Sequence, residues 1–194
     1  MSGSIFGNRI KTFQVQHTIN QYILDVLSKF SNDDFEYVSC VPTGSYVRYH
    51  RENKIKPDGH GDIDLIVYIR IKNNKYAISD LRKEFKQFLD KQSNNTTVPF
   101  KDGKNKGSKS QLFGSIVTCG YPIVTDLGQD ITNYVQIDNM IVDSVEELDF
   151  QRNFFNLSVQ TQATLQGIMR CLLWENEYKN QNCIPLSQLE YNLS

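Results

Sequence analysis

The chain has 194 residues, of which 39% are hydrophobic and 11% aromatic. This length and composition predict one domain with a real apolar core, or one domain carrying a small helical appendage. The formal net charge is −1, so no overall positive field attracts nucleic acid, and any polyanion must meet a local basic patch. No apolar run is long enough to cross a membrane, and the first eleven residues lack the apolar core of a signal peptide.

The cysteines predict a reducing environment. Cys40, Cys119, Cys171 and Cys183 fall inside predicted helices or strands and show no Cys-x-x-Cys spacing. This pattern indicates free thiols in a reducing compartment and favours neither a disulfide framework nor a zinc site. We therefore expect a cytoplasmic protein without a membrane partner.

The periodicity of apolar residues predicts alternating helices and strands along the chain. Helical spacing covers residues 13–30 and 78–91, and Leu165 to Leu173 mark a further helix near the C-terminus. The predicted strands cover residues 35–41, 62–71, 112–119 and 133–142. We expect an α/β (α+β) fold in which a mixed β-sheet packs against helices, with residues 1–150 forming one domain and residues 151–194 forming a helical segment packed on it.

Two carboxylates stand one residue apart at the start of the strand over 62–71. Residues i and i+2 of a strand project from the same face, so Asp62 and Asp64 point together and the apolar residues between them face a core. Adjacent carboxylates repel each other unless a positive charge lies between them, and Mg²⁺ takes such hard oxygen ligands. The alternatives are a solvated sheet face and a turn that uses Asp after Gly61.

A Gly-Ser step precedes this acidic pair. Gly44 and Ser45 follow the strand predicted over 35–41, where they can open a helix or a tight turn with free backbone N–H groups. Such a terminus is a ready anion site. A phosphate bound there would lie close to a metal held by Asp62 and Asp64.

An apolar residue, Gly-Ser, a linker and then Asp-apolar-Asp-apolar resemble the signature of the nucleotidyltransferase superfamily related to DNA polymerase beta. The linker of sixteen residues, from Tyr46 to Gly61, is longer than the commonest spacing in that family. The Gln-Ile-Asp sequence at 136–138, with Gly167 and Arg170 further on, also resembles nucleotidyltransferases encoded in tailed-phage genomes. That narrower resemblance implies the host cytoplasm as the location.

The family resemblance implies a third carboxylate on a later strand, and Asp138 is the candidate. Strand alternation puts Asp138 on one face with Gln136, opposite an apolar stripe. The resemblance further implies that Asp62, Asp64 and Asp138 hold two Mg²⁺ or Mn²⁺ ions and that Gly44 and Ser45 hold the triphosphate. The rivals of Asp138 stand in turn-like surroundings: Asp126, Asp130 and Asp143.

Basic residues between Gly-Ser and the acidic pair are candidates for binding phosphate. Arg48 and Lys56 are the ones we assign to the nucleotide, and Arg51 and Lys54 add to the same patch. His50 and His60 are interpreted as loop residues, with His60 a candidate for lining the pocket. A second lysine-rich segment, over 101–109, is interpreted as a solvated loop, with phosphate binding as its alternative.

The resemblance implies a metal-dependent enzyme that transfers a nucleoside monophosphate from a nucleoside triphosphate to a hydroxyl acceptor and releases pyrophosphate. The acceptor would be RNA, DNA, a small molecule or a protein, with residues 1–150 as the catalytic domain. Two alternatives stay open: a non-catalytic nucleotide- or nucleic-acid-binding module on the same fold, and a metal-dependent nuclease. The sequence specifies neither the base, the acceptor nor the oligomeric state.

Overall fold

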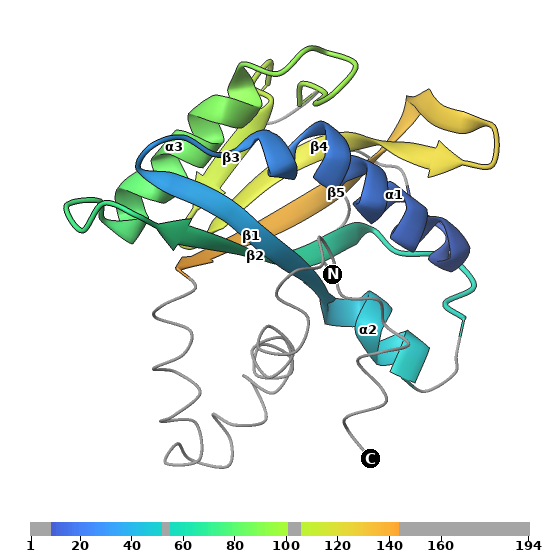
Figure 1. Ribbon diagram of the computed structural model, residues 1–194. Coiled ribbons are helices and arrows are strands. Elements are labelled where there is room, and N and C mark those ends of the chain that lie inside the picture. The colour runs from blue at the N-terminus through green and yellow to red at the C-terminus, as the bar shows by residue number, and fades with distance from the viewer. Residues whose placement is uncertain (1–8, 52–54, 101–105, 144–194) are drawn as a thin grey trace.

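The computed structural model describes residues 9–51, 55–100 and 106–143. Its centre is a five-stranded sheet in the order β1-β2-β5-β4-β3 (Figure 1). The strands are β1 (Phe35–Thr43), β2 (Asp62–Ile71), β3 (Ser110–Phe113), β4 (Ile116–Thr125) and β5 (Gly128–Asp143). Neighbouring strands are antiparallel except β2 and β5, which run parallel. The sheet is therefore mixed, as the sequence predicts.

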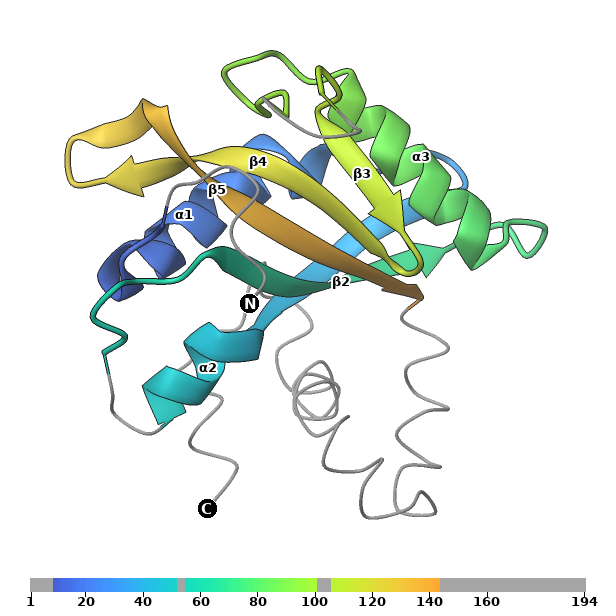
Figure 2. The ribbon, with the colours of Figure 1, turned by 180° about the vertical axis from the view of Figure 1, so that it is seen from behind.

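Within the described residues, three α-helices accompany the sheet, and two of them cover one of its faces. Helix α1 (Thr12–Asp25) and helix α3 (Ile78–Asp90) lie on the same side in both views, while α2 (Gly44–Arg51) leaves the end of β1 (Figures 1 and 2). The apolar stripes of the covering helices are buried: Val15, Ile19, Tyr22 and Ile23 on α1, and Leu81, Phe85 and Leu89 on α3. This confirms the expected mixed α+β packing.

The two faces of the sheet have different roles because side chains alternate along each strand. On β5, the amide oxygen of Asn139 accepts a hydrogen bond of 3.0 Å from the Tyr22 hydroxyl of α1. Asn139 thus points toward the helices, and its neighbour Asp138 points to the opposite face. On β2, Ile63, Leu65, Val67 and Ile69 are buried on the helical side.

The observed elements differ from the predicted ones at three places. Helix α1 ends at Asp25, where Val26 leaves helical geometry, and one 3₁₀ turn (Leu27–Lys29) follows. The single strand predicted over 112–119 is wrong. Gly114, at φ +62°, makes a turn there that separates β3 from β4. Strand β5 begins at Gly128, earlier than its apolar residues suggest.

Several predicted features lie outside the described residues: the segment 151–194, Lys54, Cys171 and Cys183. Within the described part, Cys40 and Cys119 are buried free thiols. No helix of that part is long and apolar enough to span a membrane.

Candidate active site

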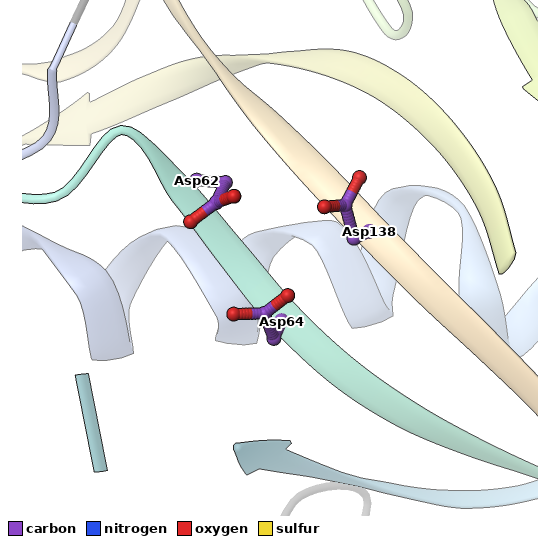
Figure 3. A group of neighbouring side chains, drawn as sticks. All are labelled: Asp62, Asp64 and Asp138. Atoms are coloured by element: carbon purple, nitrogen blue, oxygen red, sulfur yellow. The ribbon is translucent and has the colours of Figure 1, made fainter. Parts of the chain in front are cut away.

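Three carboxylates converge on the face of the sheet that α1 and α3 leave uncovered (Figure 3). The parallel register of β2 and β5 sets Asp64 beside Asp138 and Asp62 beside Gln136. One carboxylate oxygen of each acid lies within 4.8 Å of the others, and all three side chains are half-buried. No other group of three acidic, histidine or cysteine side chains in the described part of the chain is so closely spaced.

The start of helix α2 is placed against this cluster by the register of β1. Strand β1 runs antiparallel to β2 and ends with Thr43 opposite Asp64, so Gly44 begins the helix directly at the Asp64 carboxylate. Gly44 adopts φ +75°, and a Cβ there would lie 2.0 Å from Asp64 Oδ2. Position 44 therefore requires glycine for two reasons, backbone conformation and close approach.

Burial and mutual repulsion raise the pKa values of two acids of the cluster. Burial, followed by the charges of Asp62 and Asp138, raises the pKa of Asp64 from 3.8 to about 7. The pKa of Asp62 is also raised, by burial and then by Asp138, although the positive charges of Lys56 and Arg9 partly oppose this. A bound cation would lower both pKa values, because it stabilises the ionised carboxylates.

Two neighbouring side chains orient Asp138. The Thr118 hydroxyl, on β4, donates a 2.7 Å hydrogen bond to Asp138 Oδ1, and the Gln136 amide donates to the same oxygen at 3.0 Å. Thr118 is the register partner of Asp138 across β4 and β5, and Gln136 shares its face as strand alternation predicts. The carboxylate is thus held in one orientation at the edge of the cluster.

His60 is the main residue whose position the sequence does not reveal. Its side chain is fully buried, with Nδ1 3.1 Å from Ser45 Oγ and Nε2 3.1 Å from Thr12 Oγ1. The pKa of His60 is lowered from 6.5 by burial, and further by Lys56 and Arg9. The structure therefore places it in the wall of the site beside Ser45. The signal in the sequence is its position, two residues before Asp62.

The basic residues assigned to the nucleotide lie on both sides of a short segment outside the described residues. Arg48 belongs to helix α2, as does His50, which was predicted in a loop. The Lys56 ammonium lies 5.6 Å from the centre of the Tyr49 ring, and its charge reaches Asp62 and His60. Arg9 also acts on these two groups, although it stands far away in the sequence.

The rival acids are not part of the cluster. Asp126 is exposed in the turn between β4 and β5. Asp130 accepts hydrogen bonds from Thr132 and Asn133, which lower its pKa. Asp143 stands at the end of β5, opposite Ile69.

No protein-family model matches the chain, and neither does any curated protein. Among solved structures, it is similar to a cytoplasmic RNA terminal U-transferase at 15% identity and a TM-score of 0.36, over 89% of this chain and 44% of the other. It is also similar to the Cid1 poly(U) polymerase in its MgGTP-bound form, at 15% identity and a TM-score of 0.38, over 89% of this chain and 45% of the other. The chain thus spans less than half the length of these two proteins.

A third similar structure is the small alarmone synthetase 1 from Bacillus subtilis bound to AMPCPP, at 12% identity and a TM-score of 0.34, over 94% of this chain and 86% of the other. These similarities are low.

Proposed function

We propose that the protein transfers a nucleoside monophosphate from a nucleoside triphosphate to a hydroxyl acceptor, with release of pyrophosphate. The observation that carries this proposal is the convergence of Asp62, Asp64 and Asp138 at the start of helix α2. A carboxylate cluster next to the first N–H groups of a helix, which have no partners within the helix, provides cation ligands and an anion site side by side. A triphosphate needs both.

The residues present fit divalent cations. Three carboxylates supply hard oxygen ligands, and after burial their mutual repulsion raises the pKa values of Asp62 and Asp64, a repulsion that a cation between them would offset. Bound Mg²⁺ or Mn²⁺ would acidify the acceptor hydroxyl and neutralise the charge of the leaving pyrophosphate. Asp62, Asp64 and Asp138 are the proposed ligands.

Residues of the chain itself would bind the triphosphate and accept the proton of the acceptor hydroxyl. The backbone N–H groups at Gly44 and Ser45, the Ser45 hydroxyl, Lys56 and Arg48 are proposed to hold the phosphate oxygens. The acceptor oxygen attacks the α-phosphorus, the bond to the β-phosphate oxygen breaks, and pyrophosphate departs. Asp138, held by Thr118 and Gln136, is proposed to accept the proton of the acceptor hydroxyl.

The test incubates the protein with each nucleoside triphosphate, labelled at the α-phosphate, together with Mg²⁺ or Mn²⁺ and a panel of RNA, DNA, nucleotide and protein acceptors. Label in the acceptor with equimolar pyrophosphate supports the proposal. Metal-dependent cutting of labelled nucleic acid without a triphosphate would indicate a nuclease. Nucleotide binding without turnover for any acceptor would indicate a binding module.

Asp138→Asn is the sharpest variant for the proposed proton acceptor. We expect it to keep much of the triphosphate affinity and to lose at least about a hundredfold in transfer, because even residues behind a metal ligand commonly contribute ten- to a hundredfold. Asp126→Asn, Asp130→Asn and Asp143→Asn serve as matched controls and should stay active. An inactive control beside an active Asp138→Asn would show that the third carboxylate is misassigned.

A further inference from the structure

His60 connects the first turns of two helices through its two ring nitrogens. Thr12, the first residue of α1, lies at Nε2, and Ser45, the second residue of α2, lies at Nδ1, both at 3.1 Å. The imidazole is fully buried, so both nitrogens need partners and water cannot readily replace them.

The backbone holds this ring in place. The N–H groups of Ile10 and His60 each donate to the other residue's carbonyl, at 2.9 and 2.7 Å. Arg9 donates to the carbonyls of Asp58 and Gly59. Residues 9–12 thus fix the approach of His60 to Ser45, although the two segments are far apart in the sequence.

The direction of the hydrogen bond between His60 and Ser45 decides what Ser45 can offer a ligand. A hydroxyl has one hydrogen to donate. If Ser45 donates it to Nδ1, only lone pairs remain, and these repel phosphate oxygens, which are acceptors. If Nδ1–H donates to Ser45 Oγ, the hydroxyl hydrogen is free for a phosphate oxygen. Thr12 favours this second arrangement when its hydroxyl donates to Nε2.

We propose that His60 is a positioning residue that, together with Thr12, turns the Ser45 hydroxyl into a hydrogen-bond donor toward the triphosphate. The order of donation runs from Thr12 to His60, from His60 to Ser45, and from Ser45 to a phosphate oxygen. This inference rests on the proposed function of the same site. It adds His60 and Thr12 as residues that act on the triphosphate through Ser45, at the start of α2.

The two amide substitutions of His60 separate its two nitrogens. His60→Asn can place an amide N–H near Nδ1 and so keep the donor to Ser45, whereas His60→Gln reaches toward Nε2 and loses it. Calorimetric titration with each of the four ribonucleoside triphosphates and Mg²⁺ should give His60→Asn an affinity close to that of the unaltered protein. His60→Gln should bind about tenfold more weakly, as expected for a lost hydrogen bond to a charged group. Equal affinities for the two variants would overturn the inference.

A double-substitution cycle with Ser45→Ala separates positioning from a general structural effect. His60→Gln should weaken triphosphate binding in the unaltered protein and have no further effect when Ser45 is already Ala. Additive losses would overturn the inference, because His60 would then act by another route. In steady-state assays, His60→Gln should raise KM for the triphosphate and leave kcat nearly unchanged.

Thr12→Val provides an independent check if His60 variants fail to fold. Valine keeps the shape of threonine but cannot donate to Nε2, so triphosphate affinity should fall severalfold although Thr12 touches no ligand. Unchanged affinity for Thr12→Val would contradict the proposed order of donation.

Failure of the proposed function looks different: the unaltered protein would bind none of the four triphosphates. If the function holds but the inference fails, the unaltered protein binds and His60→Gln and Thr12→Val bind equally well.

Discussion

Asp64 is the residue on which the geometry of the site converges. It faces Thr43 on one neighbouring strand and Asp138 on the other, and it touches the start of α2 at Gly44. Its carboxylate is half-buried beside two further acids, which explains its raised pKa. When it is ionised, such a group destabilises the metal-free fold, and a carboxylate perturbed in this way marks a candidate functional site.

We predict that Asp64→Asn abolishes metal-dependent transfer, with a loss of about a hundredfold or more, because it removes a proposed metal ligand while keeping the side-chain shape. The metal-free variant should melt a few degrees above the unaltered protein at neutral pH, because a buried repulsion is gone. Transfer assays and thermal melting in EDTA check both parts. A fully active Asp64→Asn protein would refute the assignment.

At position 44, we predict that Gly44→Ala is far more damaging than an ordinary glycine replacement. The new Cβ would meet the Asp64 carboxylate at 2.0 Å, in addition to the strain of φ +75°. Gly114→Ala is the matched control, since Gly114 has φ +62° and nothing lies within 4 Å of its Cβ position. Chemical denaturation should show the larger loss for Gly44→Ala, and much of the difference should vanish in an Asp64→Ala background.

At the scale of elements, residues 9–12 and the loop before β2 form one unit. Gly59 adopts φ +72°, and a Cβ there would lie 2.5 Å from the Ile10 carbonyl oxygen. We predict that Gly59→Ala separates residues 9–12 from the loop, lowers stability and weakens triphosphate binding through His60. Gly107→Ala, at φ +86° with open space around it, should change neither by much. Denaturation and calorimetric titration of both variants provide the comparison.

The sequence predicts the elements with strong periodicity and the side chains that share a strand. Asp62 and Asp64 follow from the two-residue period of β2. The third carboxylate is expected from the family resemblance, and strand alternation then puts Asp138 on one face of β5 with Gln136. The β3–β4 turn is missed because apolar residues stand on both sides of Gly114 and mask the break. The contacts of His60 with Thr12 and Arg9 with Gly59 join segments 48 and 50 residues apart, and local pattern carries no information about such pairs.

At the scale of the whole molecule, the acidic cluster makes stability depend on pH and on cations. The unfolded chain releases the Asp64 proton near the ordinary pKa of 3.8, whereas the folded chain keeps it up to about pH 7. Between these values the folded state binds more protons, so stability falls as pH rises. Without metal, we predict that the melting temperature falls over this range more steeply for the unaltered protein than for Asp64→Asn.

Added Mg²⁺ should reverse this loss. Binding requires ionised carboxylates, so the rise in melting temperature on adding Mg²⁺ should be larger at about pH 8 than at about pH 5. Asp64→Asn should show little rise at either pH. A Mg²⁺ effect that is independent of pH and of Asp64 would place the cation elsewhere.

The parallel pairing of β2 with β5 has a consequence for the folding rate of the protein. Helix α3 and the β3–β4 hairpin lie between these strands in the chain, so Asp64 and Asp138 meet only after a long loop has closed. Contacts of such large sequence separation tend to form late, and the repulsion between the acids then arises after the transition state. We therefore expect Mg²⁺ to slow unfolding and to leave the folding rate nearly unchanged. The cation would stabilise the sheet only once its strands have paired, and it would take no part in forming them.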